Sequence, residues 1–244
     1  MDENKIQEEP IDTGSDDQET EGLSALEKKY QAQMRQIVTQ KLDLPVSALP
    51  TMFLCYSLRA VVLLSGYLES FLKDCMSAFI SQVNNLGKPL SELPIKMKYT
   101  HFENGARALG KQLKQDRKNG NTVLCEDLAS RLASVGAPTG YTLAWEAFAD
   151  TQANPGPEVI GCLLSQVGVE NAWKKLHDAT PPGLVDLRMF LTSFIEMRNE
   201  CAHSGNATSP PTAPGLVEYG QNLSGLGIAM VKVLEDRLAE LSAL

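Results

Sequence analysis

Residues 184–205 read LVDLRMFLTSFIEMRNECAHSG, and their pattern decides the fold class of the chain. Apolar residues recur at every third or fourth position, which is the spacing of one face of an α-helix. At about 100° per residue, Phe194 lies about 40° from Arg198, so the arginine falls on the apolar face. His203 lies about 140° further around, in the last turn. The stretch predicts a packed helix over residues 184–203 that carries a guanidinium on its buried side.

A guanidinium on an apolar face must reach water, pair with a buried carboxylate, or lie at a seam that is open to a ligand. The structural interpretation is an ion pair between Arg198 and a carboxylate of a neighbouring helix, such as Glu69. For His203 the structural interpretation is a contact with the free carbonyls at the helix end, where Gly205 is the expected C-cap. The functional interpretation is that both side chains serve a ligand, because histidine exchanges protons near neutral pH.

Helical periodicity recurs along the chain, and no run shows the alternation that predicts a β-strand. The longest helical segment, residues 52–84, has one apolar stripe and is the expected central helix. Its stripe consists of Leu58, Val61, Leu64, Leu68, Leu72, Cys75 and Phe79. Further helices are expected at residues 23–41, 101–118, 122–134, 157–177, 184–203 and 216–241. The sequence therefore predicts an all-α fold, an up-down bundle of long helices with a helical elaboration in the middle.

Charge is concentrated at the N-terminus. Residues 1–22 hold nine acidic residues against the single basic residue Lys5, so this stretch carries −8, the formal net charge of the whole chain. Few apolar residues and many charges predict a disordered acidic tail there, followed by one helical domain over residues 23–244. The remaining body is neutral overall, so its net charge argues neither for nor against a nucleic-acid partner.

Several function classes leave no trace in the sequence. Five cysteines without a C-x-x-C pair, mostly among apolar neighbours, predict reduced, buried thiols in a cytoplasmic protein. The acidic N-terminus lacks a signal-peptide pattern, and no stretch reaches the roughly 18 apolar residues of a membrane span. No metal and no cofactor are expected, since zinc-type Cys/His spacing and phosphate-binding loops are both missing. Gly220, Gly225 and Gly227 fit no nucleotide-binding fingerprint and are expected to allow close helix packing.

The pattern Arg198-Asn199-x-x-Ala202-His203 ends an apolar helix and precedes a small-residue loop and one more long helix. In that context it resembles the R-x(4–6)-H hallmark of the HEPN superfamily (higher eukaryotes and prokaryotes nucleotide-binding). Residues 64–74 are similar to the acidic-residue helix of its RiboL-PSP-HEPN subgroup. The likeness is close over 184–203, weaker over 56–84 and 216–241, and lost over most of 87–180. Residues 87–182 are therefore expected to be an insertion in a HEPN-like domain, with the motif helix and final helix in 183–244.

The resemblance implies a helical bundle that forms a homodimer, in which two motifs face each other across a cleft and cut RNA without a metal. By this resemblance Arg198 would hold the scissile phosphate, and His203 would transfer protons as a 2′-hydroxyl attacks it. Asn199 would contact RNA or orient His203. Glu69 would hold Arg198, with Asp74 as the alternative. Because many HEPN proteins bind or scaffold without cutting, a non-catalytic module for RNA, a nucleotide or a protein is the second hypothesis.

A basic cluster with helical spacing lies in the middle of the chain, formed by Lys111, Lys114, Arg117 and Lys118. Such a run is typical of a solvated helix face, and it could also supply contacts to an RNA backbone. The expected partners are RNA, a second copy of the chain and, in a toxin–antitoxin, phage-defence or stress-response setting, a neutralising protein. Some HEPN toxins carry a modified tyrosine two residues after the histidine. Here that position is Gly205, so this form of control is not expected.

Overall fold

The computed structural model describes residues 22–39, 49–120, 122–134, 140–152, 154–204, 207 and 209–244. Every regular element in these ranges is a helix, which confirms the predicted all-α class. The expected acidic tail up to residue 21, most of the proline-containing break after the first helix, and Gly205 lie outside the described residues.

The α-helices, in chain order, are α1 (Leu23–Thr39), α2 (Leu49–Asn85), α3 (Ile95–Asn119), α4 (Val123–Ser134), α5 (Pro157–Gln166), α6 (Ala172–Ala179), α7 (Leu187–Ser204) and α8 (Ala213–Ala243). Two single-turn 3-10 helices, η2 (Leu90–Glu92) and η3 (Trp145–Ala147), lie in the connections before α3 and after α4. No helix in the described ranges combines the length and the apolarity that crossing a bilayer requires.

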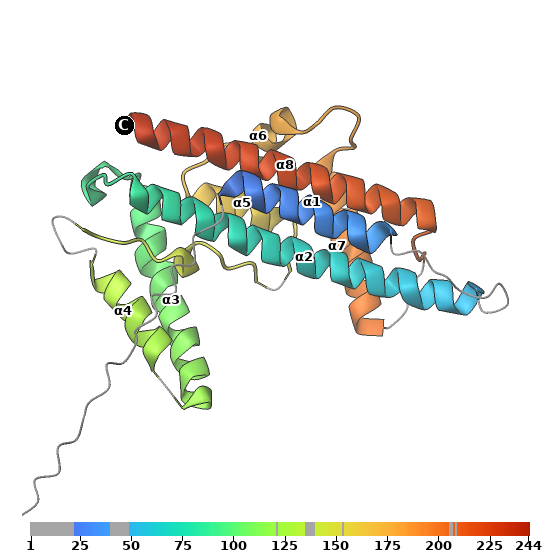
Figure 1. The fold of residues 1–244 in the computed structure, drawn as a ribbon, viewed down its shortest axis with the longest axis horizontal. Helices are drawn as coiled ribbons and strands as arrows, with labels where there is room; N and C mark the ends of the chain where they lie inside the picture. Colours follow the sequence, from blue (N-terminus) through green and yellow to red (C-terminus); the bar gives the residue numbers. More distant parts are fainter. Residues whose placement is uncertain are drawn as a thin grey trace, which may run out of the picture.

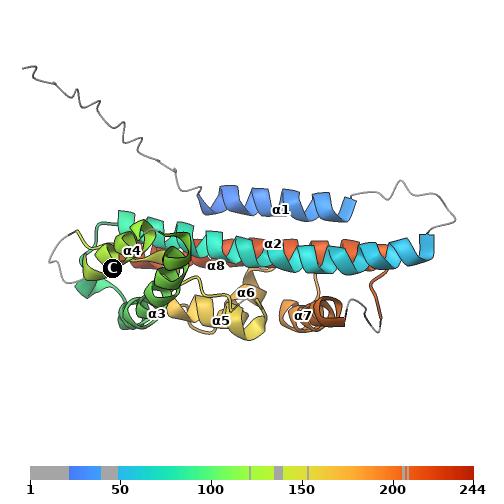
Figure 2. The same ribbon diagram turned by 90° about the horizontal axis from the view of Figure 1, so that it is seen from below.

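The two longest helices, α2 and α8, lie side by side and run in the same direction (Figure 1). Helix α1 packs on both of them in the opposite direction, on one face of the pair. The other face is covered by α3, α5, α6 and α7, so the molecule has three layers (Figure 2). Helix α7 crosses under α2 and α8 instead of running along them, and α4 packs against α3 at one end.

Helix α2 is the central helix that its apolar stripe predicts. All seven residues of that stripe are buried, and the six from Val61 to Phe79 have no exposed surface. Because helices cover α2 from both sides, burial extends beyond the stripe to Phe71, Met76 and Ile80. A helix that buries most of its circumference gains hydrophobic stabilisation from each layer, and any polar group on it then needs a compensating partner.

The contact between α1 and the α2–α8 pair depends on glycine. Tyr30 of α1 is buried and stacks on Phe71 of α2, with ring centroids 4.1 Å apart. A Cβ atom at Gly227 of α8 would lie 2.8 Å from the Tyr30 ring, and one at Gly225 would lie still closer to the Leu184 side chain. The prediction that these two glycines allow close packing is confirmed.

Buried polar contacts join α3, α4 and η3. The Asp116 carboxylate on α3 is fully buried and accepts hydrogen bonds from the Gln112 side chain (2.6 Å) and from the backbone N–H of Cys125 (2.8 Å), in the first turn of α4. Arg131 of α4 donates to both carboxylate oxygens of Glu146 in η3, at 2.7 and 2.8 Å. A bidentate pair of this kind fixes orientation as well as distance. It holds η3 against the two helices.

One predicted helix is wrong. The sequence predicts a single helix over residues 157–177, but α5 and α6 are separate elements. The chain turns between them through two left-handed residues, Gly168 (φ +83°) and Asn171 (φ +50°). Arg237 of α8 explains the break, because its Nε donates to the carbonyl of Val167 at 3.0 Å and its guanidinium lies where a Cβ at position 168 would be. This tertiary contact ends the helix, and local periodicity does not report it.

Two further expectations need correction. Helix α3 begins at Ile95, well before the expected residue 101, because Pro94 precedes it and its carbonyl accepts the N–H of the buried Met97. The thiols are not uniformly buried. Cys75 and Cys201 are buried, whereas Cys162 is exposed on α5, whose other face buries Ile160, Leu163 and Leu164.

We predict that Gly227→Ala lowers the free energy of unfolding by about 1–3 kcal/mol, because the added methyl group forces the stacked Tyr30 ring to move. Gly110→Ala is the matched control, since no atom lies within 4 Å of a Cβ there and alanine favours a helix interior. This control should raise the free energy of unfolding by about 0.5–1 kcal/mol. Urea titrations of both variants measure the difference, and equal effects would contradict the close packing.

His101 should make stability depend on pH. It is buried between α3 and the 141–149 segment, and burial, with the nearby Arg131 charge, lowers its pKa to about 4. As the pH falls, His101 is therefore protonated near pH 6.5 in the unfolded chain but stays neutral down to about pH 4 in the folded chain. The contribution of neutral, buried His101 to the free energy of unfolding is complete above about pH 6.5. It is lost as the pH falls toward 4, at up to about 1.4 kcal/mol per pH unit. The advantage of the wild type over His101→Gln should shrink over that window in urea titrations; parallel curves would contradict it.

Candidate functional site

Helix α7 carries the motif and is fixed by contacts at its start and in its middle. It begins where the Asp186 carboxylate accepts the backbone N–H groups of Arg188 (2.9 Å) and Met189 (3.0 Å), as an N-cap residue does. In its middle, Phe194 is fully buried and meets Tyr219 of α8 edge-on, with ring centroids 5.5 Å apart. Contacts of this kind set the rotation of the helix. They determine which direction the C-terminal half of α7 faces.

Arg198 lies on this stripe and is half-buried. Its Nη1 donates a hydrogen bond to the Oδ1 of the adjacent Asn199, at 3.0 Å. Leu187, Leu191, Phe194, Ile195 and Cys201, which share that side of the helix, are all buried. The guanidinium thus emerges from a packed helix face and is oriented by a neighbouring amide.

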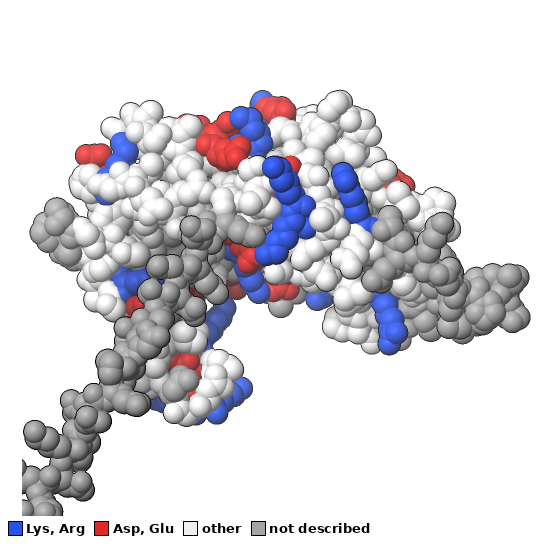
Figure 3. Space-filling model, viewed as in Figure 1, with Lys and Arg blue, Asp and Glu red and all other residues white. Residues whose placement is uncertain are grey.

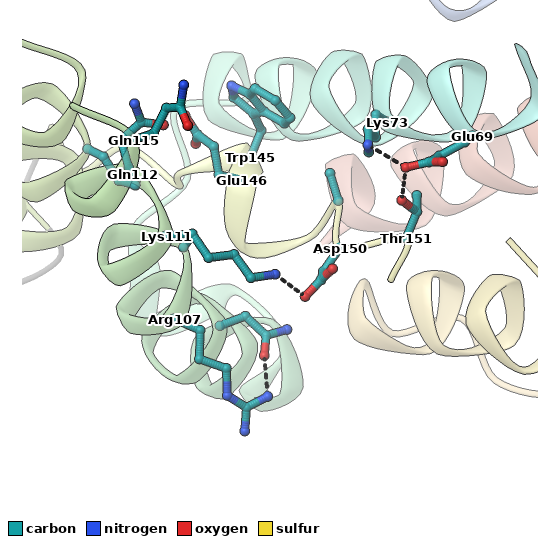
Figure 4. A pocket seen from close by; sticks show the side chains of 14 residues that line it. Glu69, Lys73, Arg107, Lys111, Gln112, Gln115, Trp145, Glu146, Asp150 and Thr151 are labelled. Carbon is teal, nitrogen blue, oxygen red and sulfur yellow. Dashed lines mark hydrogen bonds and ion pairs between the residues drawn. The ribbon is translucent and has the colours of Figure 1, made fainter. Parts of the chain in front are cut away.

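Glu69, the expected partner of Arg198, lies in the middle of α2. Its Oε1 accepts hydrogen bonds from Lys73 Nζ (2.7 Å) and from the Thr151 hydroxyl (2.9 Å), as Figure 4 shows. Burial alone disfavours the charged carboxylate, but these hydrogen bonds and the charges of Lys73 and Arg198 outweigh it, so the pKa of Glu69 lies below its ordinary value. Arg198 therefore acts on Glu69 through its charge, while Lys73 and Thr151 supply the direct contacts.

The other predicted residues are divided between two regions. His203 is exposed in the last turn of α7, beyond the half-buried Asn199. Asp74 is exposed on α2 and lines a different pocket, between α1 and α2, together with Lys29 and Tyr30. The charge of Arg198 acts on Glu69, whereas Asp74 lies on the part of α2 that lines the pocket toward α1.

The four residues of the basic cluster on α3 are all exposed, but their surroundings differ. Lys111 lines a pocket and forms an ion pair with Asp150 at 2.9 Å, whereas Lys114, Arg117 and Lys118 are exposed and do not line it. On the face of the molecule shown in Figure 3, basic side chains stand singly or in small groups among acidic and uncharged ones. An anionic ligand on that face would not meet a continuous basic surface.

The pocket beside Lys111 was not predicted. It has a volume of about 560 Å³ and lies between α2, α3 and the chain that runs from η3 to Thr151 (Figure 4). Glu69 forms part of its wall, so this pocket and the surroundings of Arg198 share one carboxylate. One of its other walls is α3, and the last comes from the segment 145–151, which has no periodicity and which sequence patterns do not place. Among the described residues, no three His, Cys, Asp or Glu side chains form a group that could hold a metal ion.

The comparison with protein families gives one result that covers most of the chain. The family model of RiboL-PSP-HEPN matches residues 29–239. The chain belongs to the RiboL-PSP-HEPN family. The match confirms the resemblance drawn from the motif. It also spans residues 87–180, over most of which the motif-based resemblance does not extend. HEPN membership associates this chain with ribonuclease-like or nucleotide-binding modules. Neither the curated proteins nor the solved structures contain a significant match.

We predict that Thr151→Val raises the pKa of Glu69, because the carboxylate of this HEPN domain loses a hydrogen bond that favours its charged form. The free energy of unfolding at pH 7 should fall by about 1–2 kcal/mol. Since the pKa of Glu69 is lowered on folding, this loss should be complete above the ordinary carboxyl pKa and should shrink as the pH falls below it. Carboxyl NMR titration measures the shift. Thr151→Ser keeps the hydroxyl and should leave the pKa of Glu69 unchanged; an equal shift in both variants would contradict the assignment.

Proposed function

We propose that the protein is a metal-independent endoribonuclease of HEPN type, whose site forms when two copies of the chain bring their α7 helices together. The observation that carries the proposal is the state of the motif on α7. Arg198 is half-buried and oriented by Asn199 at 3.0 Å, while His203, one turn later, is exposed. A fixed cation and an accessible proton carrier are the two groups that phosphodiester cleavage needs when no metal takes part.

In the proposed reaction the 2′-hydroxyl of a ribose attacks the adjacent phosphorus. A bond forms between the 2′-oxygen and phosphorus, and the bond between phosphorus and the 5′-oxygen of the next nucleotide breaks. His203 of one chain takes up the 2′-hydroxyl proton, and His203 of the second chain returns a proton to the leaving 5′-oxygen. The products are a 2′,3′-cyclic phosphate and a 5′-hydroxyl end. Arg198 stabilises the charge that builds up on the non-bridging phosphate oxygens.

The role proposed for Glu69 is positional. A guanidinium must keep its orientation and its charge while a phosphate approaches, and a nearby carboxylate with a lowered pKa remains negative as the site changes. Lys73 and Thr151 in turn fix that carboxylate. Glu69 therefore acts through Arg198 and is not expected to contact the scissile phosphate. An RNA-cleaving dimer of this kind suits a toxin–antitoxin, phage-defence or stress-response setting, where a partner protein would restrain it.

We predict that the purified protein cleaves single-stranded RNA in excess chelator, and that His203→Ala slows cleavage by about 10²–10⁴-fold because proton transfer is lost. Arg198→Ala should slow it by about 10²–10³-fold through lost charge stabilisation. Gel analysis of the products, with a test for the 2′,3′-cyclic phosphate end, measures both effects.

Two matched control variants use residues of the same type outside the motif. Arg188→Ala removes an exposed arginine from the same helix, and His177→Ala removes an exposed histidine from α6. Both should cleave RNA at the wild-type rate. Cleavage that survives loss of both Arg198 and His203 would refute the site. Retention of RNA without cleavage would instead favour the second candidate, a non-catalytic RNA-binding module. Growth arrest on expression, relieved by His203→Ala, would support the toxin setting.

A further inference from the structure

The pocket between α2, α3 and η3 has the size of a small-ligand site. Its volume of about 560 Å³ falls within the range of about 300–1,000 Å³ that is usual for such sites. Its walls come from three segments that are far apart in the sequence, and each is held in place by a specific contact. Asp116 joins α3 to α4, Arg131 fixes η3 through Glu146, and Thr151 fixes the following loop to Glu69. The pocket is therefore preformed.

One wall of the pocket offers an aromatic surface. Trp145 of η3 lines it and is 37% exposed, although tryptophan is mostly buried in folded proteins. Gln112 and Gln115 lie beside the indole on the facing helix α3 (Figure 4). An exposed indole provides a stacking surface for a planar base, and amide side chains can both donate to and accept from a base edge. This wall suits an unpaired nucleobase.

The part of the pocket away from Trp145 carries two cationic side chains that can leave their present partners at low energetic cost. Lys111 pairs with Asp150 across the mouth, and their side chains are 69% and 42% exposed. Arg107 pairs with Glu103 at 2.6 Å, and both of these side chains are about two-thirds exposed, at 65% and 67%. Exposed ion pairs contribute little to stability, so either cation can turn to a phosphate group. Three carboxylates line the pocket, and each is paired with a cation. Asp150 pairs with Lys111, Glu69 with Lys73, and Glu146 with Arg131.

We infer that this pocket binds one unpaired nucleotide of a single-stranded RNA, with the base on Trp145 and the phosphate at Lys111 and Arg107. The identification of the ligand as RNA rests on the proposed function. Glu69 connects the pocket with the motif on α7. It lines the pocket, and it also lies close enough to Arg198 for their charges to interact. A strand that enters the pocket with one nucleotide would continue along α2 toward the guanidinium. The pocket thus selects unpaired RNA and holds it beside the site of cleavage.

Binding of a fluorescein-labelled 12-nucleotide oligouridylate to the full-length chain tests the inference, with His203→Ala as the background so that the probe stays intact. In that background Trp145→Ala and Lys111→Glu should each weaken binding at least about tenfold, as loss of one stacked base or one reversed phosphate contact does. Lys232→Glu is the matched control. It makes the same charge change at an exposed lysine of α8 that also pairs with an aspartate, and it should weaken binding less than about threefold.

A second measurement reports directly on the stacked ring. Trp145 and Trp173 are the two tryptophans of the chain, so a Trp173→Phe variant that still unfolds cooperatively makes Trp145 the sole indole emitter. RNA should quench its fluorescence with the same midpoint as the labelled probe. Equal losses for Lys111→Glu and Lys232→Glu, together with no effect of Trp145→Ala, would overturn the pocket assignment even if the wild type cleaves RNA. Pocket-dependent binding by a wild type that cuts nothing would refute the nuclease and support the pocket.

Discussion

The carboxylate of Glu69 is the constraint on which the arrangement of this HEPN domain depends. It lies in the middle of α2, a helix that packing layers cover on two sides, and an ionised group in such a place needs compensating contacts. Lys73 compensates it from the next turn of the same helix, Thr151 from the middle segment, and the charge of Arg198 from α7. One carboxylate therefore connects α2, the middle segment and α7, which are far apart in the sequence.

The layered architecture makes this convergence possible. Helix α1 and the glycines of α8 close one face of the α2–α8 pair, which leaves the other face for the shorter helices (Figure 2). Helix α7 crosses that face, and its rotation is set by the packing of Phe190 and Phe194 on Tyr219. The same packing buries the apolar residues beside Arg198 and leaves His203 at the exposed end. The two ends of the motif thus have different environments on one rigid element.

The middle segment contributes more than an addition to the bundle. Its α3–α4 pair and η3 are fixed by a buried aspartate and a bidentate arginine, and together they form a wall opposite α2. Through Thr151 this segment also holds the carboxylate that interacts with the charge of Arg198. The family match continues through these residues. In this protein the surroundings of the motif are therefore built partly from the segment that the sequence motif alone does not reach.

The sequence by itself determined the helical class, the central helix and the motif, because apolar periodicity over 18 or more residues survives in almost any packing. It also offered Glu69, with Asp74 as the alternative, as a carboxylate partner for Arg198. Only the tertiary structure decided the rest. Arg237 lies at the break between α5 and α6, and Lys111 of the basic cluster lines the pocket between α2 and α3, as does Trp145 of η3. These features arise from contacts between residues that are far apart in the chain, and such contacts leave no period in the sequence.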